Sequence, residues 1–347
     1  MLLSDLKLIA GPCSAESYEQ LRSIASSLQQ FNLFGFRAGI WKPRTKPGSF
    51  EGIGELGLSW LQEIQNEFGI DVITEVASPM HVEQCLKKGF KKVWIGARTT
   101  SNPFSVQELA ESLQGTGLTV LIKNPMNPDL HLWIGGIERL KKMGMNNIIA
   151  VHRGFSTYDK QKYRNLPNWQ IPIALRSAMP DLEIICDPSH ISGVAQNVPQ
   201  VAQKAIDLKF DGLMIEVHNN PNIAKTDAKQ QLNIEQFSGL ISALKIRSRD
   251  EIDHDDLLEI RAQLSVLDEQ LAEILAKRMD CSDQIGEYKK RNHIAIFQSG
   301  QWEESLRKFL SLAQATDLDP IFAAEIFKLI HQASIDRQSK VFNNTNE

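Results

Sequence analysis

Four side chains that can ligate a divalent metal ion lie at or just beyond the ends of short apolar runs in the first two thirds of the chain. They are Cys13, His190, Glu216 and Asp227. Alone, Cys13 would be interpreted as a small buried hydrophobe, but three further ligands at matching positions favour a metal site. A thiolate, an imidazole and two carboxylates suit manganese, iron, cobalt or zinc, and geometry and availability decide among them. The pattern predicts one divalent metal ion.

Positive charge is concentrated at the same kind of position. Six basic side chains fall at or just past the end of an apolar run, namely Arg37, Lys42, Arg44, Arg98, Lys123 and Arg153. Any one of them alone would be interpreted as a solvated surface charge. A guanidinium, however, binds phosphate or carboxylate through two parallel hydrogen bonds and keeps its charge when partly buried. Six such cations therefore predict anionic substrates, and two phosphorylated substrates would fit them.

The apolar runs alternate with helical patterns from residue 1 to about 245, which is typical of repeated βα units around a parallel sheet. Eight strands are expected, and they begin at Leu6, Phe34, Asp71, Lys92, Thr119, Asn147, Glu183 and Gly212. A doubly wound sheet would satisfy the periodicity equally well. The candidate residues follow almost every strand, however, and active sites of (β/α)8 barrels lie at those carboxyl ends. We therefore expect an α/β fold built on a (β/α)8, or TIM, barrel.

The composition changes sharply where the barrel is expected to end. The segment KIRSRDEID, which begins at Lys245, is strongly polar and follows the last helix of the barrel pattern. The barrel is therefore assigned to residues 1–246 and a linker to residues 247–253. Residues 254–347 form a separate domain in this interpretation.

Helical periodicity runs through this last domain. Apolar residues recur from Leu257 to Ile285 without a proline, which predicts one unusually long helix. A second helix is expected from Trp302 to about Ala315, and a third follows Asp319-Pro320 and runs to about residue 340. A helix so long cannot bury its apolar stripe within so short a segment. An all-α three-helix domain that forms a homodimer, or a higher oligomer, is therefore expected.

Composition excludes several classes of function. The net charge of −4 gives no basic field for nucleic acid, and no apolar run approaches the roughly 18 residues of a membrane span. The four cysteines are scattered and form no disulfide framework, which suits a reducing compartment. The first residues lack the pattern of a signal peptide. A cytoplasmic protein that binds neither nucleic acid nor membrane is expected.

Seven short motifs of the barrel resemble one family in their order along the chain. They are GPCS at Gly11, KPRT at Lys42, GART at Gly96, KNP at Lys123, HRG at His152, DPSH at Asp187 and IEVH at Ile215. The resemblance is to 3-deoxy-D-arabino-heptulosonate 7-phosphate (DAHP) synthase of type Iβ. It implies that the barrel condenses phosphoenolpyruvate with erythrose 4-phosphate.

The resemblance also implies residue roles. Cys13, His190, Glu216 and Asp227 would ligate the metal, and Arg44 and Thr45 would hold erythrose 4-phosphate. Phosphoenolpyruvate would be surrounded by Arg37, Lys42, Arg98, Lys123 and Arg153. Lys42 would donate a proton to the developing alkoxide or act by its charge alone, and His218 is a candidate to support the ligands.

A related synthase that uses arabinose 5-phosphate is the competing interpretation of the barrel. That enzyme has an asparagine-containing motif where this chain has KPRT, so Pro43 and Arg44 favour the four-carbon sugar. The DAHP synthase family often carries a regulatory domain before the barrel, whereas this barrel is expected to begin within a few residues of Met1. Regulation is therefore expected to come from the helical tail.

The tail resembles a second family, the all-helical chorismate mutases. The motifs are LLEIR at Leu257, LAKRMD at Leu275, IGEYKK at Ile285 and LIHQASIDRQ at Leu329. By this resemblance Arg278, Lys289, Ser334 and Gln338 form the pocket for chorismate, and Arg261 reaches it from the second subunit. Cations would bind the two carboxylates and hold the substrate in its compact reactive shape.

One departure from the mutase pattern affects the second helix. The family usually has an arginine followed by a glutamate where this chain has Gln301 and Trp302. Glu303 could replace the carboxylate only if the helix register shifted, because neighbouring positions point about 100° apart. Two hypotheses follow for the tail, namely an active mutase, or mainly a sensor that binds chorismate or prephenate and inhibits the barrel.

Overall fold

The structure is a computed structural model that describes residues 5–42, 48, 50–158, 162–247 and 255–343, and the side chains of residues 255–257 are excluded. The chain divides into two compact units, Met1–Arg249 and Asp250–Glu347. Of the predicted linker 247–253, only Arg247 falls within the described residues.

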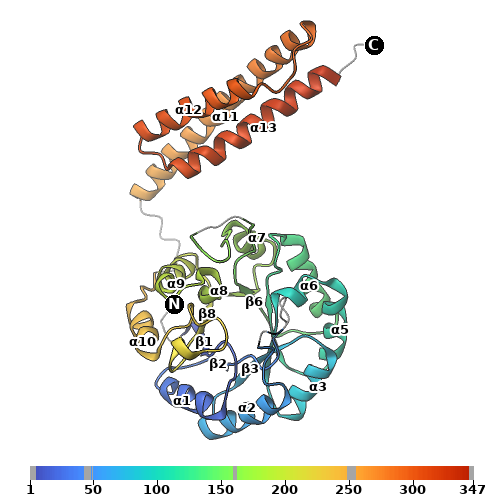
Figure 1. Ribbon diagram of the computed structural model, residues 1–347, viewed down its shortest axis with the longest axis vertical. Coiled ribbons are helices and arrows are strands. Elements are labelled where there is room, and N and C mark those ends of the chain that lie inside the picture. The colour runs from blue at the N-terminus through green and yellow to red at the C-terminus, as the bar shows by residue number, and fades with distance from the viewer. Residues whose placement is uncertain (1–4, 43–47, 49, 159–161, 248–254, 344–347) are drawn as a thin grey trace. The chain divides into compact units, whose positions relative to one another are not determined.

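Eight parallel strands form a closed barrel in the first unit, in which each strand pairs with the next and β8 pairs with β1 (Figure 1). The predicted (β/α)8 barrel is confirmed, and the doubly wound alternative is wrong because the sheet closes. The strands are β1 (Lys7–Gly11), β2 (Gly35–Arg37), β3 (Val72–Val76), β4 (Lys92–Ile95), β5 (Thr119–Lys123), β6 (Ile148–His152), β7 (Glu183–Cys186) and β8 (Gly212–Glu216).

The described part of the first unit has ten α-helices. In Figure 1 the longer ones form a ring around the strands, whereas α8 lies inside the ring beside β8. The ten helices are α1 (Tyr18–Leu28), α2 (Glu55–Phe68), α3 (Pro79–Lys87), α4 (Ala97–Thr100), α5 (Pro103–Leu113), α6 (Leu130–Lys142), α7 (Gln170–Ala178), α8 (Pro188–Ser192), α9 (Val198–Asp207) and α10 (Ile234–Ala243). Side-chain caps fix several starts: Ser17 begins α1, Ser78 begins α3 and Asp187 begins α8.

Two apolar layers hold the barrel. One fills its interior with alternate strand residues, namely Ile9, Ile73, Trp94, Leu121, Ile149, Val151, Ile185 and Met214. The other lies between strands and helices and contains most of the remaining buried apolar side chains. The interior layer packs the barrel solid, and the buried ionic side chains Arg37, Lys123 and Glu216 lie at the carboxyl ends of their strands.

Strand register places the functional ends side by side. Gly11 is the partner of Glu216 across β1 and β8, and His152 is the partner of Cys186 across β6 and β7. Cys13 therefore emerges next to Glu216, and Arg153 emerges next to Asp187.

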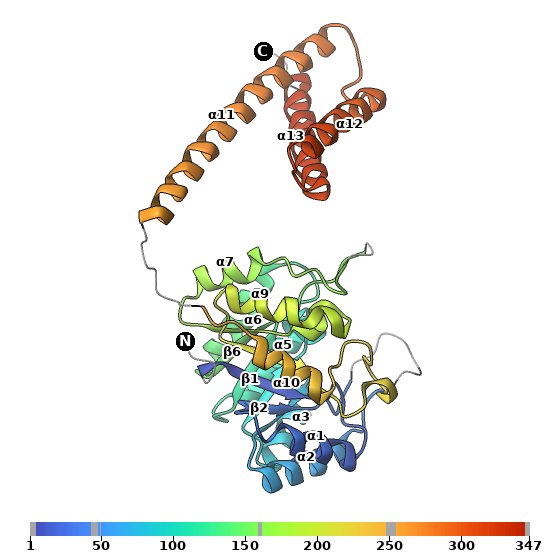
Figure 2. The same ribbon diagram turned by 90° about the vertical axis from the view of Figure 1, so that its left-hand side faces the viewer.

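Within residues 255–343, the described part of the second unit, there are three helices as predicted: α11 (Asp255–Arg291), α12 (Ser299–Ala315) and α13 (Pro320–Asn343). Helix α13 packs against α11 and α12. In Figure 2 the first half of α11 extends beyond its two partners. That half exposes a run of large apolar side chains, namely Leu258, Ile260, Leu264, Val266, Leu267, Leu271 and Ile274.

Within the residues that the structure describes, no helix is both long enough and apolar enough to cross a membrane.

The buried His152 predicts a pH dependence of barrel stability. Its ring is packed among Trp133, Phe155, Trp169 and Phe210, and burial, with added repulsion from Arg153, lowers its pKa to about 3. An unfolded histidine has a pKa of about 6.5. As pH falls from about 6.5 towards 3, only the unfolded state gains this proton, so stability falls by roughly 1 kcal/mol between pH 6.5 and 5.5.

Urea unfolding followed by tryptophan fluorescence tests this, because five of the six tryptophans belong to the barrel unit. His152→Phe keeps the aromatic packing and removes the titrating group. The variant should lose less stability than the wild type over this pH interval. Equal slopes for the two proteins would contradict the assignment.

Candidate active sites

Three of the four predicted metal ligands converge at the carboxyl end of the barrel. Cys13 follows β1, Glu216 ends β8, and Asp227 lies in the loop beyond it. One ligand atom from each lies within 4.8 Å of the others. The Cys13 thiol donates a hydrogen bond to Asp227 Oδ2 at 3.4 Å. Residues that lie more than 200 positions apart in the chain thus present sulfur and oxygen donors to one point.

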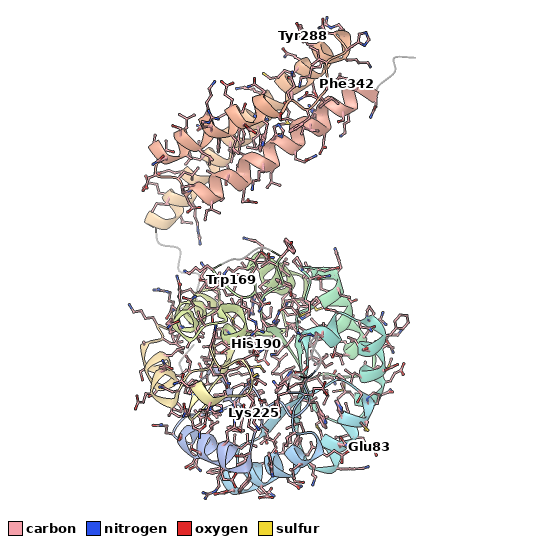
Figure 3. The ribbon with its side chains drawn as sticks, in the orientation of Figure 1. Glu83, Trp169, His190, Lys225, Tyr288 and Phe342 are labelled. Atoms are coloured by element: carbon pink, nitrogen blue, oxygen red, sulfur yellow. The ribbon has the colours of Figure 1, made fainter. Side chains whose placement is uncertain are left out.

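His190, the fourth predicted ligand, borders this group from α8. Its Nε2 lies 3.7 Å from Glu216 Oε1, and its Nδ1 lies 2.8 Å from Asp187 Oδ2. Figure 3 places His190 near the middle of the barrel. Burial lowers the pKa of His190, which favours the neutral imidazole that metals bind. Asp187 also caps α8 by accepting a hydrogen bond from the His190 backbone N–H at 3.1 Å. The same carboxylate therefore stabilises the start of α8 and orients the His190 ring.

The charges of this donor set fit a divalent cation. Burial and the neighbouring Glu216 raise the pKa of Cys13 to about 12. The pKa of Asp227 is lowered because His190 and Arg164 outweigh the effect of its burial. The buried Cys13 thiol, the buried Glu216 carboxylate and the partly buried Asp227 carboxylate thus bring potential negative charge to one point, where a divalent cation would be stabilised.

A second buried cluster adjoins the donors. Arg37 Nη2 donates to Glu216 Oε1 at 3.0 Å, and Lys123 Nζ lies 2.8 Å from Asp187 Oδ2. Arg37 Nη1 is 3.9 Å from the same Asp187 oxygen. Both cations also lie over the Trp94 ring, at 5.2 Å and 5.6 Å from its centroid. Residues from β2, β5 and the end of β7 thus form one ionic network.

Arg153 and Arg98 add positive charge on the β4–β6 side. Arg153 is buried, donates to Asn165 Oδ1 at 2.9 Å, and has its pKa lowered to about 10 by burial. Arg98 is exposed on α4, and its charge is close enough to oppose that of Arg153. Two guanidinium groups that repel each other form a place where an anion binds favourably.

Lys42 reaches the donors from the loop after β2. Its Nζ donates to the Cys13 carbonyl oxygen and lies 3.3 Å from Cys13 Sγ. Its backbone N–H donates to the Glu51 carbonyl at 2.8 Å, and the preceding Trp41 stacks on His81 with ring centroids 3.8 Å apart. These contacts fix the start of the loop. Arg44 and Thr45 lie outside the described residues.

The predicted pocket residues of the helical unit gather where α11 and α13 pack. Arg278 donates to the Ser334 hydroxyl, and Lys289 donates to the Ile296 carbonyl at 2.6 Å. Eleven positions separate Arg278 from Lys289, close to three helical turns, so both lie on one face of α11. Ser334 and Gln338 lie one turn apart on α13 and are both buried.

Arg261 is not part of this cluster. It is exposed and lies almost five turns before Arg278 on the same helix, about 25 Å away along the axis. A straight helix cannot bring it to the Arg278 pocket of its own chain.

Comparisons with protein families assign each of the two units to a family. Residues 4–252 match the model of the DAHP synthetase I family, which covers most of the chain. The chain belongs to this family. Residues 260–339 match the chorismate mutase type II model, so the helical unit of this DAHP synthetase I family member is a chorismate mutase domain.

Individual relatives extend the comparison. The phospho-2-dehydro-3-deoxyheptonate aldolase of Thermotoga maritima is 32% identical over 238 residues, which are 69% of this chain and 68% of that protein. Its crystal structure superposes with a TM-score of 0.62 at 30% identity, over 68% of this chain and 67% of that one. A 2-dehydro-3-deoxyphosphooctonate aldolase of Desulfosudis oleivorans is 26% identical over 259 residues, 69% of this chain and 89% of that protein.

Sequence reasoning missed several polar residues of the barrel site. Arg164 binds Asp227 Oδ1 at 2.9 Å and Gln230 Oε1 at 2.8 Å, and Gln230 in turn donates to Glu216 Oε2 at 2.7 Å. Neither residue belongs to a quoted motif, and both lie in loops. Asp187 stands within the DPSH motif, where a carboxylate directly after a buried strand could have signalled its role.

The departure from the mutase pattern has a clear structural result. Gln301 is exposed and donates to the Ser305 hydroxyl at 3.3 Å, and Glu303 is exposed as well. Trp302 instead packs on His331, with ring centroids 4.1 Å apart, and on Phe327 at 5.6 Å. The helix register is therefore not shifted, and the carboxylate of Glu303 does not take the place of the glutamate in the family pattern.

Asp187 predicts a large stability effect. Asp187→Asn keeps the cap of α8 but removes the charge that Lys123 and Arg37 contact, and removing one partner of a buried ionic network costs about 3–5 kcal/mol. Urea unfolding measures the change. Asp71→Asn is the control, because Asp71 pairs with Lys91 and Lys92 while partly exposed and should cost at most about 1 kcal/mol. Equal losses would contradict the account of the network.

Proposed function

We propose that the barrel condenses phosphoenolpyruvate with erythrose 4-phosphate to give 3-deoxy-D-arabino-heptulosonate 7-phosphate, the first step of aromatic amino-acid biosynthesis. One observation carries the proposal: the Cys13, Glu216 and Asp227 donors adjoin the buried cations Arg37 and Lys123 at the carboxyl end of the barrel. A carbonyl-polarising metal and an anion site are thereby neighbours.

The choice of sugar rests on two further points. The aldolase from Thermotoga maritima shares more identity with this chain than the phosphooctonate aldolase from Desulfosudis oleivorans, 32% against 26%. The KPRT motif at Lys42 also favours the four-carbon sugar over arabinose 5-phosphate. Both observations support erythrose 4-phosphate.

The metal would be held by Cys13, Glu216 and Asp227, with His190 as the fourth ligand. When bound, a divalent manganese, iron, cobalt or zinc ion supplies Lewis acidity at the aldehyde carbonyl. The protein residues do the rest. Arg37, Lys123, Arg153 and Arg98 hold the phosphate and carboxylate of phosphoenolpyruvate and turn its C3 towards the aldehyde.

This arrangement suggests how protons and phosphate move during the condensation. C3 of the enol phosphate attacks the aldehyde carbon, and Lys42, 3.3 Å from Cys13 Sγ, donates a proton to the developing alkoxide. Water adds to C2 and returns one proton to Lys42. The new hydroxyl then passes its proton to the phosphate as the bond between C2 and the phosphate oxygen breaks, which leaves a keto group at C2 and releases inorganic phosphate. Arg44 and Thr45 would hold the sugar phosphate.

Metal removal should abolish condensation but spare the tail. A strong chelator and Cys13→Ala should each lower the consumption of phosphoenolpyruvate by at least about a hundredfold, because Lewis-acid catalysis contributes several kcal/mol. Conversion of chorismate by the same preparation is the control and should not change. Full synthase activity after verified metal removal would overturn the metal assignment.

The helical domain rearranges chorismate to prephenate in this proposal. Arg278 and Lys289 bind the two substrate carboxylates and the ether oxygen, and Ser334 and Gln338 line the pocket. Burial lowers the pKa of Lys289 and of Arg278, so a dianionic substrate would satisfy cations that the fold has partly desolvated. The reaction is intramolecular and needs no nucleophile.

A homodimer completes this pocket. The first half of α11 exposes seven large apolar side chains, of which Ile260, Leu264, Leu267, Leu271 and Ile274 lie on one face of the helix, and such a face favours association with a second copy. Arg261 lies on the same half and is too far from Arg278 within one chain. A second copy would bring its Arg261 to the pocket, so association and substrate binding are coupled.

Hybrid dimers test the shared pocket. Arg261→Ala and Arg278→Ala should each abolish mutase activity as pure proteins and leave synthase activity intact. In an equal mixture that has exchanged subunits, half of the dimers are hybrids and one of their two pockets is complete. About a quarter of wild-type mutase activity should return. If the mixture showed no mutase activity although subunit exchange had been demonstrated, this result would contradict a pocket built from two chains.

A second candidate role for the tail is feedback inhibition of the barrel by chorismate or prephenate, and the extreme form of this alternative is a sensor with weak or no mutase activity. The replacement of the Arg-Glu pair by Gln301 and Trp302 favours the sensor with weak or no mutase activity, because two polar groups of the usual mutase pocket are absent. Inhibition requires that the ligand bind one arrangement of the domains more tightly than another.

Truncation after Ile246 tests this regulatory role. The barrel alone should keep its synthase activity and lose inhibition by chorismate and prephenate, because the ligand-binding domain is gone. Initial rates with and without each compound, on the truncated and the full chain, give the answer. Undiminished inhibition of the truncated protein would place the sensor in the barrel.

A further inference from the structure

In the proposed mutase pocket, two cations have no carboxylate beside them among the described residues. Among the described residues no carboxylate opposes the burial that lowers the pKa of Arg278 and of Lys289, and the exposed Glu303 lies outside the pocket. Where the family pattern has a glutamate, Trp302 fills the space with an indole ring. The pocket therefore needs another neutral or acidic group for any substrate oxygen that the cations do not bind.

His331 occupies the position where such a group is needed. It precedes Ser334 by three residues and Gln338 by seven on α13, and this spacing places all three on one face of the helix. Its ring packs on Trp302 with centroids 4.1 Å apart and planes inclined by 47°, and its centroid lies 6.3 Å from that of Phe297. The imidazole is therefore held between aromatic rings at the edge of the pocket.

The electrostatic surroundings keep this imidazole neutral. Burial lowers the pKa of His331, and the charges of Arg278 and Lys289 lower it further. Arg278 donates to the Ser334 hydroxyl, one turn along α13 from His331, and this contact places His331 beside the proposed pocket residues. Within the described part of the helical unit neither ring nitrogen hydrogen-bonds to another protein group. A neutral imidazole offers one donor and one acceptor.

Chorismate carries two carboxylates, an ether oxygen and a ring hydroxyl. The cations suit the first three, whereas a hydroxyl is best bound by a neutral group that can both donate and accept. We propose that His331 binds the ring hydroxyl of the mutase substrate, and that Trp302 holds the imidazole in place for this contact. This inference rests on the proposed mutase function and adds a residue that determines specificity.

Paired substrates distinguish a binding role from a structural one. The probe is chorismate together with an analogue in which hydrogen replaces the ring hydroxyl, and the readout is kcat/KM for rearrangement by the full-length protein. His331→Phe keeps an aromatic ring against Trp302 but removes both ring nitrogens. It should lower kcat/KM for chorismate about tenfold or more and change the value for the analogue less than about twofold.

Two further variants sharpen the comparison. His331→Gln restores a donor and an acceptor without the ring and should recover part of the preference for chorismate. Gln332→Ala is the matched control, because Gln332 is exposed on the next position of α13 and bonds only to Asp336 among the described residues. This control should match the wild type with both substrates. Synthase activity and circular dichroism check that each variant is folded.

The outcomes separate this inference from the function on which it rests. Equal losses for both substrates in His331→Phe would assign the histidine a structural role and overturn the inference. An unchanged His331→Phe beside an inactive Arg278→Ala would also overturn it while the mutase function stands. A wild type that does not rearrange chorismate at all would remove the mutase function and the inference together.

Discussion

The barrel site depends on one buried carboxylate, Asp187. It is fully buried and lies 2.8 Å from Lys123 Nζ and from His190 Nδ1, with Arg37 at 3.9 Å. Although burial acts to raise it, these neighbours lower the pKa of Asp187 well below its usual value. A charge in this position is stable only while its partners stay in place. The Asp187 carboxylate therefore positions the candidate metal ligand His190, the candidate substrate-binding Lys123 and the start of α8.

The two candidate sites differ in whether their cations are paired with carboxylates. In the barrel, cations such as Arg37 pair with Glu216 and Asp187, so a buried network is already in place before substrate arrives. In the helical domain Arg278 and Lys289 have no carboxylate partner within the described residues, and their pKa values are lowered by burial. In the proposed function the first arrangement would orient the ligands of a metal and the cations that bind two phosphorylated substrates. The second leaves positive charge for a dianion to neutralise.

Much of this could be predicted from sequence because the barrel repeats a simple rule. Each strand is a short apolar run, and the polar residue types at its end indicate chemistry. Glu216 and Lys123 follow from their positions at strand ends, whereas Cys13 becomes a candidate only together with the other three ligands. The KPRT loop was found by motif, although Arg44 and Thr45 lie outside the described residues. Arg164 was missed because it lies in a loop without periodicity, and its partner Asp227 is 63 residues away.

The helical domain shows a different limit. Helix lengths follow from apolar spacing, and the positions of Arg278 and Lys289 follow from the motifs. The contact of Trp302 with His331 joins α12 to α13 and could not be derived from spacing within either helix. Sequence revealed that a glutamate was replaced, but only the fold revealed which neighbour the new side chain meets.

The central claim is that the chain brings Cys13, His190, Glu216 and Asp227 together around one divalent metal ion. An anomalous difference map from crystals grown with manganese tests it most directly. The account predicts a single strong peak in the barrel, within about 2.0–2.5 Å of the Cys13 sulfur and of oxygens from Glu216 and Asp227, with His190 adjoining. A peak elsewhere, or none in crystals of protein that still condenses its substrates, would contradict it.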